Sequence, residues 1–202
     1  LMGGEALQSV DLSGVESRDA FEAAIAEAHA RLPSGTWLIA NGWSQSNWAS
    51  RELPDQSWLQ CAGNRPVACW RSDLHAALVN EAAMQQCNLP GDSELATQGG
   101  AVHRDSQGNS TGLLLEAAAW KYLIPVIPAP SSEQQRSNLL SAQAHCHAFG
   151  LTAVRTMEYA RDLHATYEAM RDRLTLRCAV VLLDRELPLD LDWIEHFTQD
   201  AF

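Results

Sequence analysis

A proline-rich segment, IPVIPAP at residues 124–130, constrains the fold more than any other feature of the chain. It carries three prolines within six residues. Proline has no backbone N–H and a fixed φ, so neither a helix nor a central strand continues through such a run. The segment predicts a linker or a domain crossing. We therefore divide the chain into residues 1–128 and residues 129–202.

The sequence after the linker alternates helical and strand-like segments. In order, we expect a helix capped by Ser132, a strand over 151–157, a helix over 162–173, a strand over 174–183 and a helix over 191–202. This order is typical of parallel βα units. Two strands cannot close a sheet, so residues 129–202 are expected to form two βα units of an incomplete parallel (β/α) barrel.

The sequence before the linker predicts an α+β domain. Its first helix is expected to begin at Ser17 and to bury Phe21, Ile25 and Ala28, which recur at helical spacing. The other expected elements are strands over 9–12, 36–44 and 66–73, helices over 53–63 and from Asn80 onward, a hairpin over 101–116, and a helix after it.

Charge and composition exclude several classes of partner. The chain has 25 acidic and 14 basic residues and a net charge of −11, whereas nucleic-acid-binding proteins carry a basic stripe. No apolar run reaches the roughly 20 residues of a membrane helix, and no signal-peptide pattern is present. We expect neither a nucleic-acid nor a membrane partner. The five cysteines lack CxxC spacing, which is typical of reduced thiols, and we expect a cytoplasmic protein.

The stretch RPVACWRSDLHAALVN, residues 65–80, is the first candidate for a site. Strand alternation would place Arg71, Asp73 and His75 on one side of an extended chain as the strand ends. That polar face either meets water or lines a pocket. Ligand sites gather where a strand passes into a helix, so Asp73, His75 and Asn80 are candidates, with a purely structural histidine as the alternative.

Two further residues have both a structural and a functional interpretation. Trp43 lies among Gly, Ser and Asn residues typical of loops, where a tryptophan can present a flat apolar face to a ligand; core packing is the alternative. Glu116 ends the apolar run LLLE, as either a charge partner of the next helix or a pocket group.

The motif HCH at 145–147 does not predict a metal site. Its two histidines fall inside an expected helix, where residues two apart point about 200° away from one another. They cannot hold one ion together, so a solvated pair near the end of a helix is expected.

Four motifs in order resemble the amidohydrolases that carry a long insertion after the first barrel strand (amidohydrolase family 3). These motifs are VDLSGVES, LPSGTWLIANGWSQSNW, WRSDLHAALVN and GGAVHRDSQGNSTGLLLEAA, and GLTAVRTM then resembles the second barrel strand of the family. The resemblance implies that residues 1–128 are the α+β insertion domain and residues 129–202 a segment of the barrel.

The resemblance also implies a chemistry and a set of contacts. The family reaction would be hydrolysis of an amide-like C–N bond by water activated on zinc or another divalent metal. The insertion covers the mouth of the barrel in the family. Trp43, Asp73, His75, Asn80 and Glu116 would therefore contact a small amide-like substrate.

The sequence departs from the family at the metal site. The family takes its ligands from an HxH on the first barrel strand and from later strands, and none of these matches a residue of this chain. We therefore expect no catalytic residue, metal ligand or cofactor within it. Leu74 stands where the family has the glycine of Asp-Gly-His, and Arg155 and Thr156 stand where His-Asp is common.

Two functional hypotheses follow. The chain is either a piece of a metal-dependent amidohydrolase, inactive alone, or a non-catalytic binding or assembly module that uses a face containing Trp43 and His75. Two open, apolar barrel strands also favour a homo-oligomer formed through residues 151–202, with the helix around Trp193 and Phe197 as a candidate for exchange. The alternative is that the insertion domain folds back over these strands and covers them within one chain.

Overall fold

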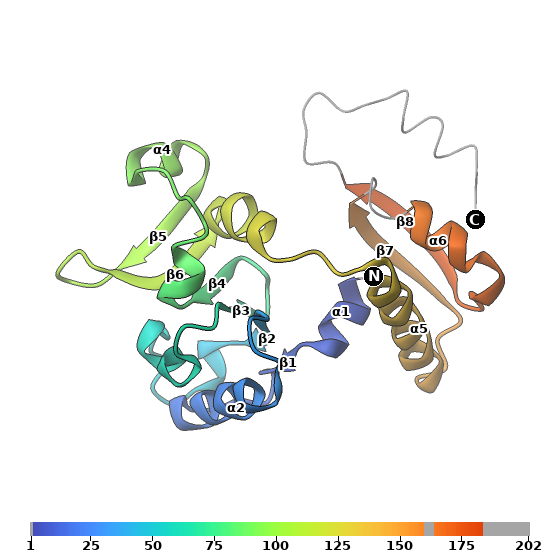
Figure 1. Ribbon diagram of the computed structural model, residues 1–202, viewed down its shortest axis with the longest axis horizontal. Helices are drawn as coiled ribbons and strands as arrows, with labels where there is room; N and C mark the ends of the chain where they lie inside the picture. Colours follow the sequence, from blue (N-terminus) through green and yellow to red (C-terminus); the bar gives the residue numbers. More distant parts are fainter. Residues whose placement is uncertain (1, 160–163, 184–202) are drawn as a thin grey trace. The chain divides into compact units, whose positions relative to one another are not determined.

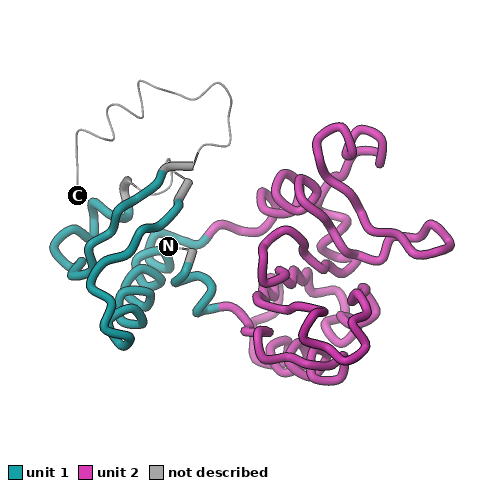
Figure 2. The backbone as a smooth tube through the Cα atoms, turned by 180° about the vertical axis from the view of Figure 1, so that it is seen from behind, with its two compact units in different colours: residues 1–8, 130–202 teal, residues 9–129 magenta. Residues whose placement is uncertain are grey.

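The computed structural model describes residues 2–159 and 164–183. The chain forms two compact units, which Figure 2 distinguishes by colour. Unit 2 consists of residues 9–129, and unit 1 of residues 1–8 together with 130–202. Among the helices described, none has both the length and the apolar composition of a membrane span.

Unit 2 is built on a six-stranded mixed sheet with the order β1-β2-β3-β4-β6-β5. The first three strands, β1 Val10–Asp11, β2 Leu38–Trp43 and β3 Val67–Arg71, are parallel. The sheet becomes antiparallel at β4 Ala76–Val79, which pairs with β3 and with β6 Ser110–Glu116, and β5 Gly100–Arg104 forms the edge. Figure 1 shows the hairpin of β5 and β6 extending from this sheet.

Both faces of the central strands are buried, which explains the apolar runs of the sequence. Val67 and Cys69 of β3 belong to one core, and Ala68 and Trp70 belong to a second core, as strand alternation requires. The first core lies under α2 Arg18–Arg31 and the 3₁₀ helix η2 Gln56–Ala62. The second is covered by the short helices α3 Glu81–Met84 and α4 Asp92–Thr97 and the π-helix η3 Ala118–Leu123, which the 3₁₀ turn η4 Ile124–Val126 follows.

The local signals for α2 and for the hairpin are confirmed. The Ser17 hydroxyl accepts a hydrogen bond from the N–H of Ala20 at 3.2 Å, and Phe21, Ile25 and Ala28 are buried. β5 and β6 pair as an antiparallel hairpin.

Unit 1 contains a parallel pair of strands packed against helices. The long helix α5 Ser132–Ala148 begins with a capping box formed by Ser131 and Gln134, one residue earlier than the sequence predicted. β7 Ala153–Tyr159 and β8 Arg177–Leu183 are parallel along their whole length, as predicted. α6 His164–Met170 and a 3₁₀ turn at Arg171–Arg173 lie between them in sequence. The predicted helix over 191–202, with Trp193 and Phe197, falls outside the described residues.

The N-terminal eight residues belong to unit 1 and not to the domain in which the sequence analysis placed them. They contain a helix that was not predicted, α1 Met2–Gln8, which packs on α5. Gly4 makes this approach possible, because a Cβ at this position would lie 2.0 Å from the carbonyl oxygen of Asn138. The linker lies where the prolines indicated, since unit 2 ends at Ala129.

One glycine of the hairpin is required for two separate reasons. Gly112 in β6 has a φ of +83°, and a Cβ there would lie 2.4 Å from the carbonyl oxygen of Val79. Gly108 in the hairpin turn has a similar φ of +85°, but a Cβ there would meet nothing within 4 Å. Alanine substitutions at the two positions therefore separate the free-energy cost of the backbone conformation from the additional cost of a steric clash.

We expect Gly108→Ala to lower the free energy of unfolding of unit 2 by about 1 kcal/mol, and Gly112→Ala to lower it by at least about 1–3 kcal/mol more. Urea unfolding followed by tryptophan fluorescence measures this, because six of the seven tryptophans lie within residues 9–129. If both variants lower the free energy of unfolding by the same amount, the close packing of β6 against β4 is contradicted.

Candidate functional site

A tight turn at Ser72–His75 joins β3 to β4 and carries the first candidate residues. The N–H of Leu74 donates to the carbonyl oxygen of Arg71 at 2.9 Å. Leu74 has a φ of +62°, in the left-handed region that L-residues other than Asn and Asp rarely adopt. The expectation that Arg71, Asp73 and His75 alternate along one strand was wrong, because the strand ends at Arg71 and the chain reverses there.

Asp73 holds this turn together. Its Oδ1 accepts a hydrogen bond from the N–H of His75 at 3.0 Å, and its two oxygens accept from Nε and Nη2 of Arg71, each at 2.8 Å. The Arg71 guanidinium, followed by the N–H of His75, holds the pKa of Asp73 below its ordinary value. A depressed carboxyl pKa means that these bonds stabilise the turn near neutral pH and are lost as the pH falls through the folded-state pKa.

His75 and Glu116 meet because β4 and β6 are paired in one register. Ala76 lies opposite Leu115, and the N–H of Glu116 donates to the carbonyl oxygen of His75 at 2.9 Å. Nδ1 of His75 lies 2.8 Å from Oε2 of Glu116. Both side chains are about half exposed, 50% for His75 and 46% for Glu116, so the pair lies at the surface of unit 2 and can reach a ligand.

Backbone strain accompanies this pair on both strands. Glu116, like Leu74, has a positive φ, here +52°. Left-handed conformations of non-glycine residues cost free energy and are concentrated at functional sites. One such residue directly precedes His75 and the other is Glu116 itself, so backbone strain accompanies both members of the pair and supports it as a candidate site.

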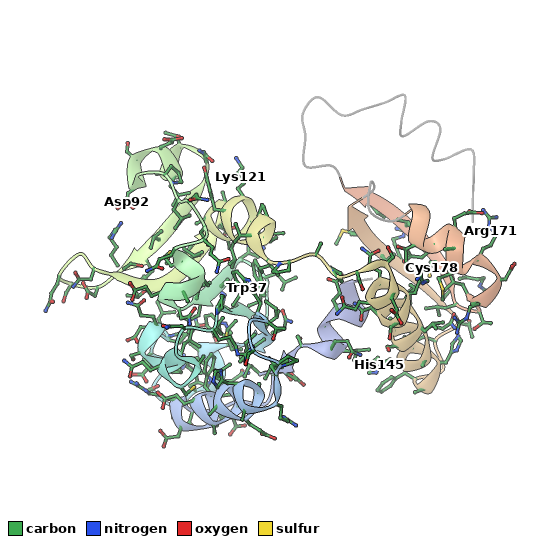
Figure 3. The ribbon with its side chains drawn as sticks, in the orientation of Figure 1. Trp37, Asp92, Lys121, His145, Arg171 and Cys178 are labelled. Atoms are coloured by element: carbon green, nitrogen blue, oxygen red, sulfur yellow. The ribbon has the colours of Figure 1, made fainter. Side chains whose placement is uncertain are left out.

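Trp120 completes the cluster and was not among the residues predicted from the sequence. Its ring lies 5.1 Å from that of His75 at an interplanar angle of 67°, and its indole N–H donates to the carbonyl oxygen of Leu74 at 2.9 Å. The side chain is still 40% exposed. Its neighbour in η3, Lys121, projects from the ribbon of unit 2 in Figure 3. The sequence contained one indication of its role: Trp120 lies four residues after Glu116, in the helix η3 that directly follows β6.

The geometry leaves two polar atoms open to a ligand. Within the described part of the chain, neither Nε2 of His75 nor Oε1 of Glu116 has a hydrogen-bond partner. An ionised carboxylate only accepts, so Nδ1 of His75 carries the proton and Nε2 of the neutral ring is an acceptor. The cluster of Leu74, His75, Glu116 and Trp120, which we call the His75 cluster, therefore offers hydrogen-bonding atoms beside an exposed aromatic ring.

Trp43 lies in the core and does not present a face to a ligand, contrary to the expectation. It ends β2, its side chain is 0% exposed, and its ring stacks on Trp48 with centroids 5.9 Å apart. Its indole N–H donates to the carbonyl oxygen of Cys69 at 2.7 Å. The Gly/Ser/Asn surroundings that indicated a loop belong to a strand end and a short 3₁₀ turn that close over this ring.

Asn80 is also structural in this chain. Its side-chain oxygen accepts from the N–H groups of Val67 and Ala83, each at 3.1 Å, and its side-chain nitrogen donates to the carbonyl oxygen of Arg65 at 2.7 Å. Asn80 caps α3, as predicted, and ties this helix to the start of β3. The Asn80 amide group is therefore fully used in hydrogen bonds to the backbone and does not join His75 in a binding face. Trp43 does not join His75 either, because it is buried.

A hollow of about 1170 Å³ elsewhere in unit 2 does not include the His75 cluster. Polar side chains of η2, α3 and the β5–β6 turn line it, among them Asp55, Gln60, Asn64, Glu81 and Asp105. Asp55 and Asp105 use carboxylate oxygens to accept backbone N–H groups of their own loops. We favour the His75 cluster as the site, because its polar atoms are open and its backbone is strained.

The described residues do not provide a metal centre. In residues 2–159 and 164–183, no three His, Cys, Asp or Glu side chains are arranged to hold an ion. His145 and His147 lie on α5, where His145 packs against the ring of Phe149. The donor set of the described residues does not fit the divalent ion that amidohydrolase chemistry requires.

Comparison with known proteins places the chain in a family. A family model described as "Amidohydrolase family" matches residues 1–200. The chain belongs to the amidohydrolase family. The resemblance expected from the four motifs is confirmed. The glycine that this resemblance implied at position 74 would suit the turn, because Leu74 has a positive φ.

Three proteins of known sequence are similar to this amidohydrolase-family chain. It is 30% identical over 155 residues to the protein LONG AFTER FAR-RED 3 of Arabidopsis thaliana, a match that covers 76% of this chain and 26% of that protein. It is 30% identical over 150 residues to the putative amidohydrolase YtcJ of Bacillus subtilis, covering 74% and 28%. It is 32% identical over 97 residues to N-substituted formamide deformylase of Arthrobacter pascens, covering 47% and 18%.

The fold is similar to that of a solved hydrolase. The chain superposes on an uncharacterized metal-dependent hydrolase from Pyrococcus horikoshii OT3 with a TM-score of 0.62 and 19% identity, covering 90% of this chain and 34% of that structure. The chain thus spans about a quarter to a third of the length of LONG AFTER FAR-RED 3, YtcJ and the Pyrococcus hydrolase.

The strain at Leu74 gives a direct test of the turn in this amidohydrolase-family chain. Leu74→Gly removes the cost of a left-handed L-residue, about 1–2 kcal/mol, and adds the smaller entropic cost of glycine. We expect the variant to raise the free energy of unfolding of unit 2 by about 0.5–1 kcal/mol. Urea unfolding followed by tryptophan fluorescence measures the change.

Leu53→Gly is the matched control, because Leu53 is also an exposed leucine but is not in the left-handed region. The control is expected to lose stability. If Leu74→Gly lowers the free energy of unfolding as much as Leu53→Gly does, the conformation of the turn is not as described.

Proposed function

We propose that this chain is part of a metal-dependent amidohydrolase that hydrolyses amide-like C–N bonds in small molecules, and that unit 2 supplies part of the wall over its substrate. The observation that carries the proposal is the His75–Glu116 pair, which is half exposed, has its two atoms 2.8 Å apart, and has a positive φ at Glu116 and at Leu74 next to His75. Membership of the amidohydrolase family supports the reaction class.

Each residue of the proposed wall has a role that follows from its contacts. His75 and Glu116 contact the substrate through Nε2 and Oε1. Asp73 positions His75, since it binds the N–H of His75 and the Arg71 guanidinium and has no contact that reaches outward from the turn. Trp43 and Asn80 are not included, because the core and the backbone use their side chains.

The metal of the proposed enzyme is held by residues other than those described. A divalent ion supplies an activated water to this class of reaction. Among the residues that the structure describes, no donor set can be assigned to such a step, and we propose that the chain alone is inactive. Unit 1, with its parallel pair β7 and β8, is proposed to be a segment of a (β/α) barrel that is complete only in a longer protein.

The test compares this chain with a protein in which it is continued by the rest of the barrel. We expect the chain alone, supplied with zinc, to release no amine from a panel of amides, and the longer protein to release it. In the longer protein His75→Gln should lower kcat/KM by about 10- to 100-fold, as loss of one substrate-contacting hydrogen bond to a polar site does. His147→Gln is the control, because His147 is exposed on α5 of the other unit.

Three outcomes contradict parts of the proposal. Turnover by the chain alone would show that the activating metal is bound within it. An unchanged kcat/KM in His75→Gln would remove unit 2 from the substrate site. A longer protein that binds amides without hydrolysing them would favour the alternative, a non-catalytic binding module that uses the His75 cluster.

We also propose that the chain alone self-associates through unit 1. Cys178 and Val180 of β8 pack toward the helices, while Met157 and Val181, which are opposite one another in the pairing of β7 and β8, are 61% and 41% exposed. A second copy covers this apolar face in the chain alone, as further barrel strands cover it in the longer protein.

Light scattering at several concentrations tests the association. We expect a dimer or higher oligomer that becomes monomeric in Val181→Lys, because a lysine on this face cannot be buried without a partner. Leu7→Lys, on the exposed side of α1 in the same unit, should leave the oligomer intact. A wild-type chain that stays monomeric at every concentration contradicts the proposal.

A further inference from the structure

Trp120 is fixed and yet exposed, which is an unusual combination for a tryptophan. Its indole N–H is bound to the carbonyl oxygen of Leu74 at 2.9 Å, and its ring lies against that of His75. These contacts satisfy the polar atom and hold the ring in place. Trp120 is nevertheless 40% exposed, and its ring centroid lies 5.1 Å from that of His75, whose Nδ1 contacts Glu116.

We propose that Trp120 is a specificity-determining residue that stacks on a planar group next to the amide, so that the site takes aromatic or heteroaromatic amides that carry no negative charge. The proposal rests on the proposed function, in which His75 and Glu116 bind the amide itself. It adds the class of substrate and a residue that the sequence did not indicate.

The contacts of Trp120 favour a planar ligand over an aliphatic one. An aromatic ring carries a negative face and a positive edge, so it prefers stacked or edge-to-face partners, which bind more tightly than their buried area alone would give. A fixed indole has already lost its rotamer freedom, so stacking on it costs little ordering. A bulky aliphatic ring of equal size gains only the burial of its surface.

The charges around the ring favour a ligand that donates an N–H group and carries no negative charge. Glu116 offers a carboxylate oxygen as an acceptor, and Asp73 adds a second negative charge that the Arg71 guanidinium neutralises. An amide N–H can donate to Oε1 of Glu116, whereas a carboxylate ligand would be repelled by it. Lys121 is exposed beside Trp120 and has no ion pair among the described residues, but it does not reverse this preference at Glu116.

Two substitutions separate stacking from a merely structural role. Trp120→Phe keeps a flat ring but loses the hydrogen bond to Leu74, and Trp120→Leu loses both. If Trp120 only clamps the turn, the two variants behave alike. If it is a stacking surface, Trp120→Phe retains most of the binding and Trp120→Leu loses it.

The experiment is a titration of this chain with benzamide, followed by NMR through the backbone amide resonances of His75 and Glu116. Cyclohexanecarboxamide is the matched ligand, because it has the same amide on a ring that is not planar. Phe149→Leu is the control variant, since Phe149 is a highly exposed aromatic residue of the other unit.

We expect benzamide to shift both resonances saturably and to bind about 2- to 12-fold more tightly than cyclohexanecarboxamide, the range given by one aromatic pair. Trp120→Leu should remove this preference, while Trp120→Phe and Phe149→Leu should keep it. Equal binding of the two ligands, no shift with benzamide, or a Trp120→Leu variant that binds benzamide like the wild type would each overturn the proposal.

These outcomes are independent of catalysis. If a longer protein hydrolyses no amide, the proposed function is wrong, but this chain would still bind benzamide at Trp120. Hydrolysis by the longer protein together with equal binding of the two ligands would retain the proposed function and remove Trp120 from it.

Discussion

The turn from Ser72 to His75 is the constraint on which the organisation of unit 2 depends. It reverses the chain between β3 and β4, and so changes the sheet from parallel to antiparallel pairing. The reversal brings His75 beside Glu116 at the end of β6, with the two atoms 2.8 Å apart. Leu74 adopts a strained backbone, and four hydrogen bonds hold it there, three accepted by Asp73 and one donated by Trp120.

The part of the fold that local chemistry determines could be predicted from the sequence. Ser17, followed by apolar residues at helical spacing, predicted α2. The turn around Gly108, between two strand-like segments, predicted the hairpin of β5 and β6. The prolines placed the boundary after residue 128, and unit 2 ends one residue later, at Ala129. Each of these features depends on residues a few positions apart, so the sequence contains all the information that is needed.

Features that depend on distant residues could not be predicted in the same way. Trp43 looked like a loop residue because its neighbours are small and polar, and only the packing of Trp48 and Val67 around it makes that position a core. α1 belongs to unit 1 because Gly4 meets Asn138, far along the chain. Within the candidate site, His75 and Glu116 were identified by resemblance to a family, but Trp120 was missed because its role arises from the contact with the Leu74 turn.

The central claim is that this turn and the register of β4 with β6 hold a proton on Nδ1 of His75 between the imidazole and Glu116. Long-range ¹H–¹⁵N correlation spectra of the His75 ring measure this most directly. We predict that the neutral ring carries its proton on Nδ1, and that Glu116→Ala abolishes this preference. A neutral His75 ring protonated on Nε2 in the wild-type chain, unchanged by Glu116→Ala, would contradict the account.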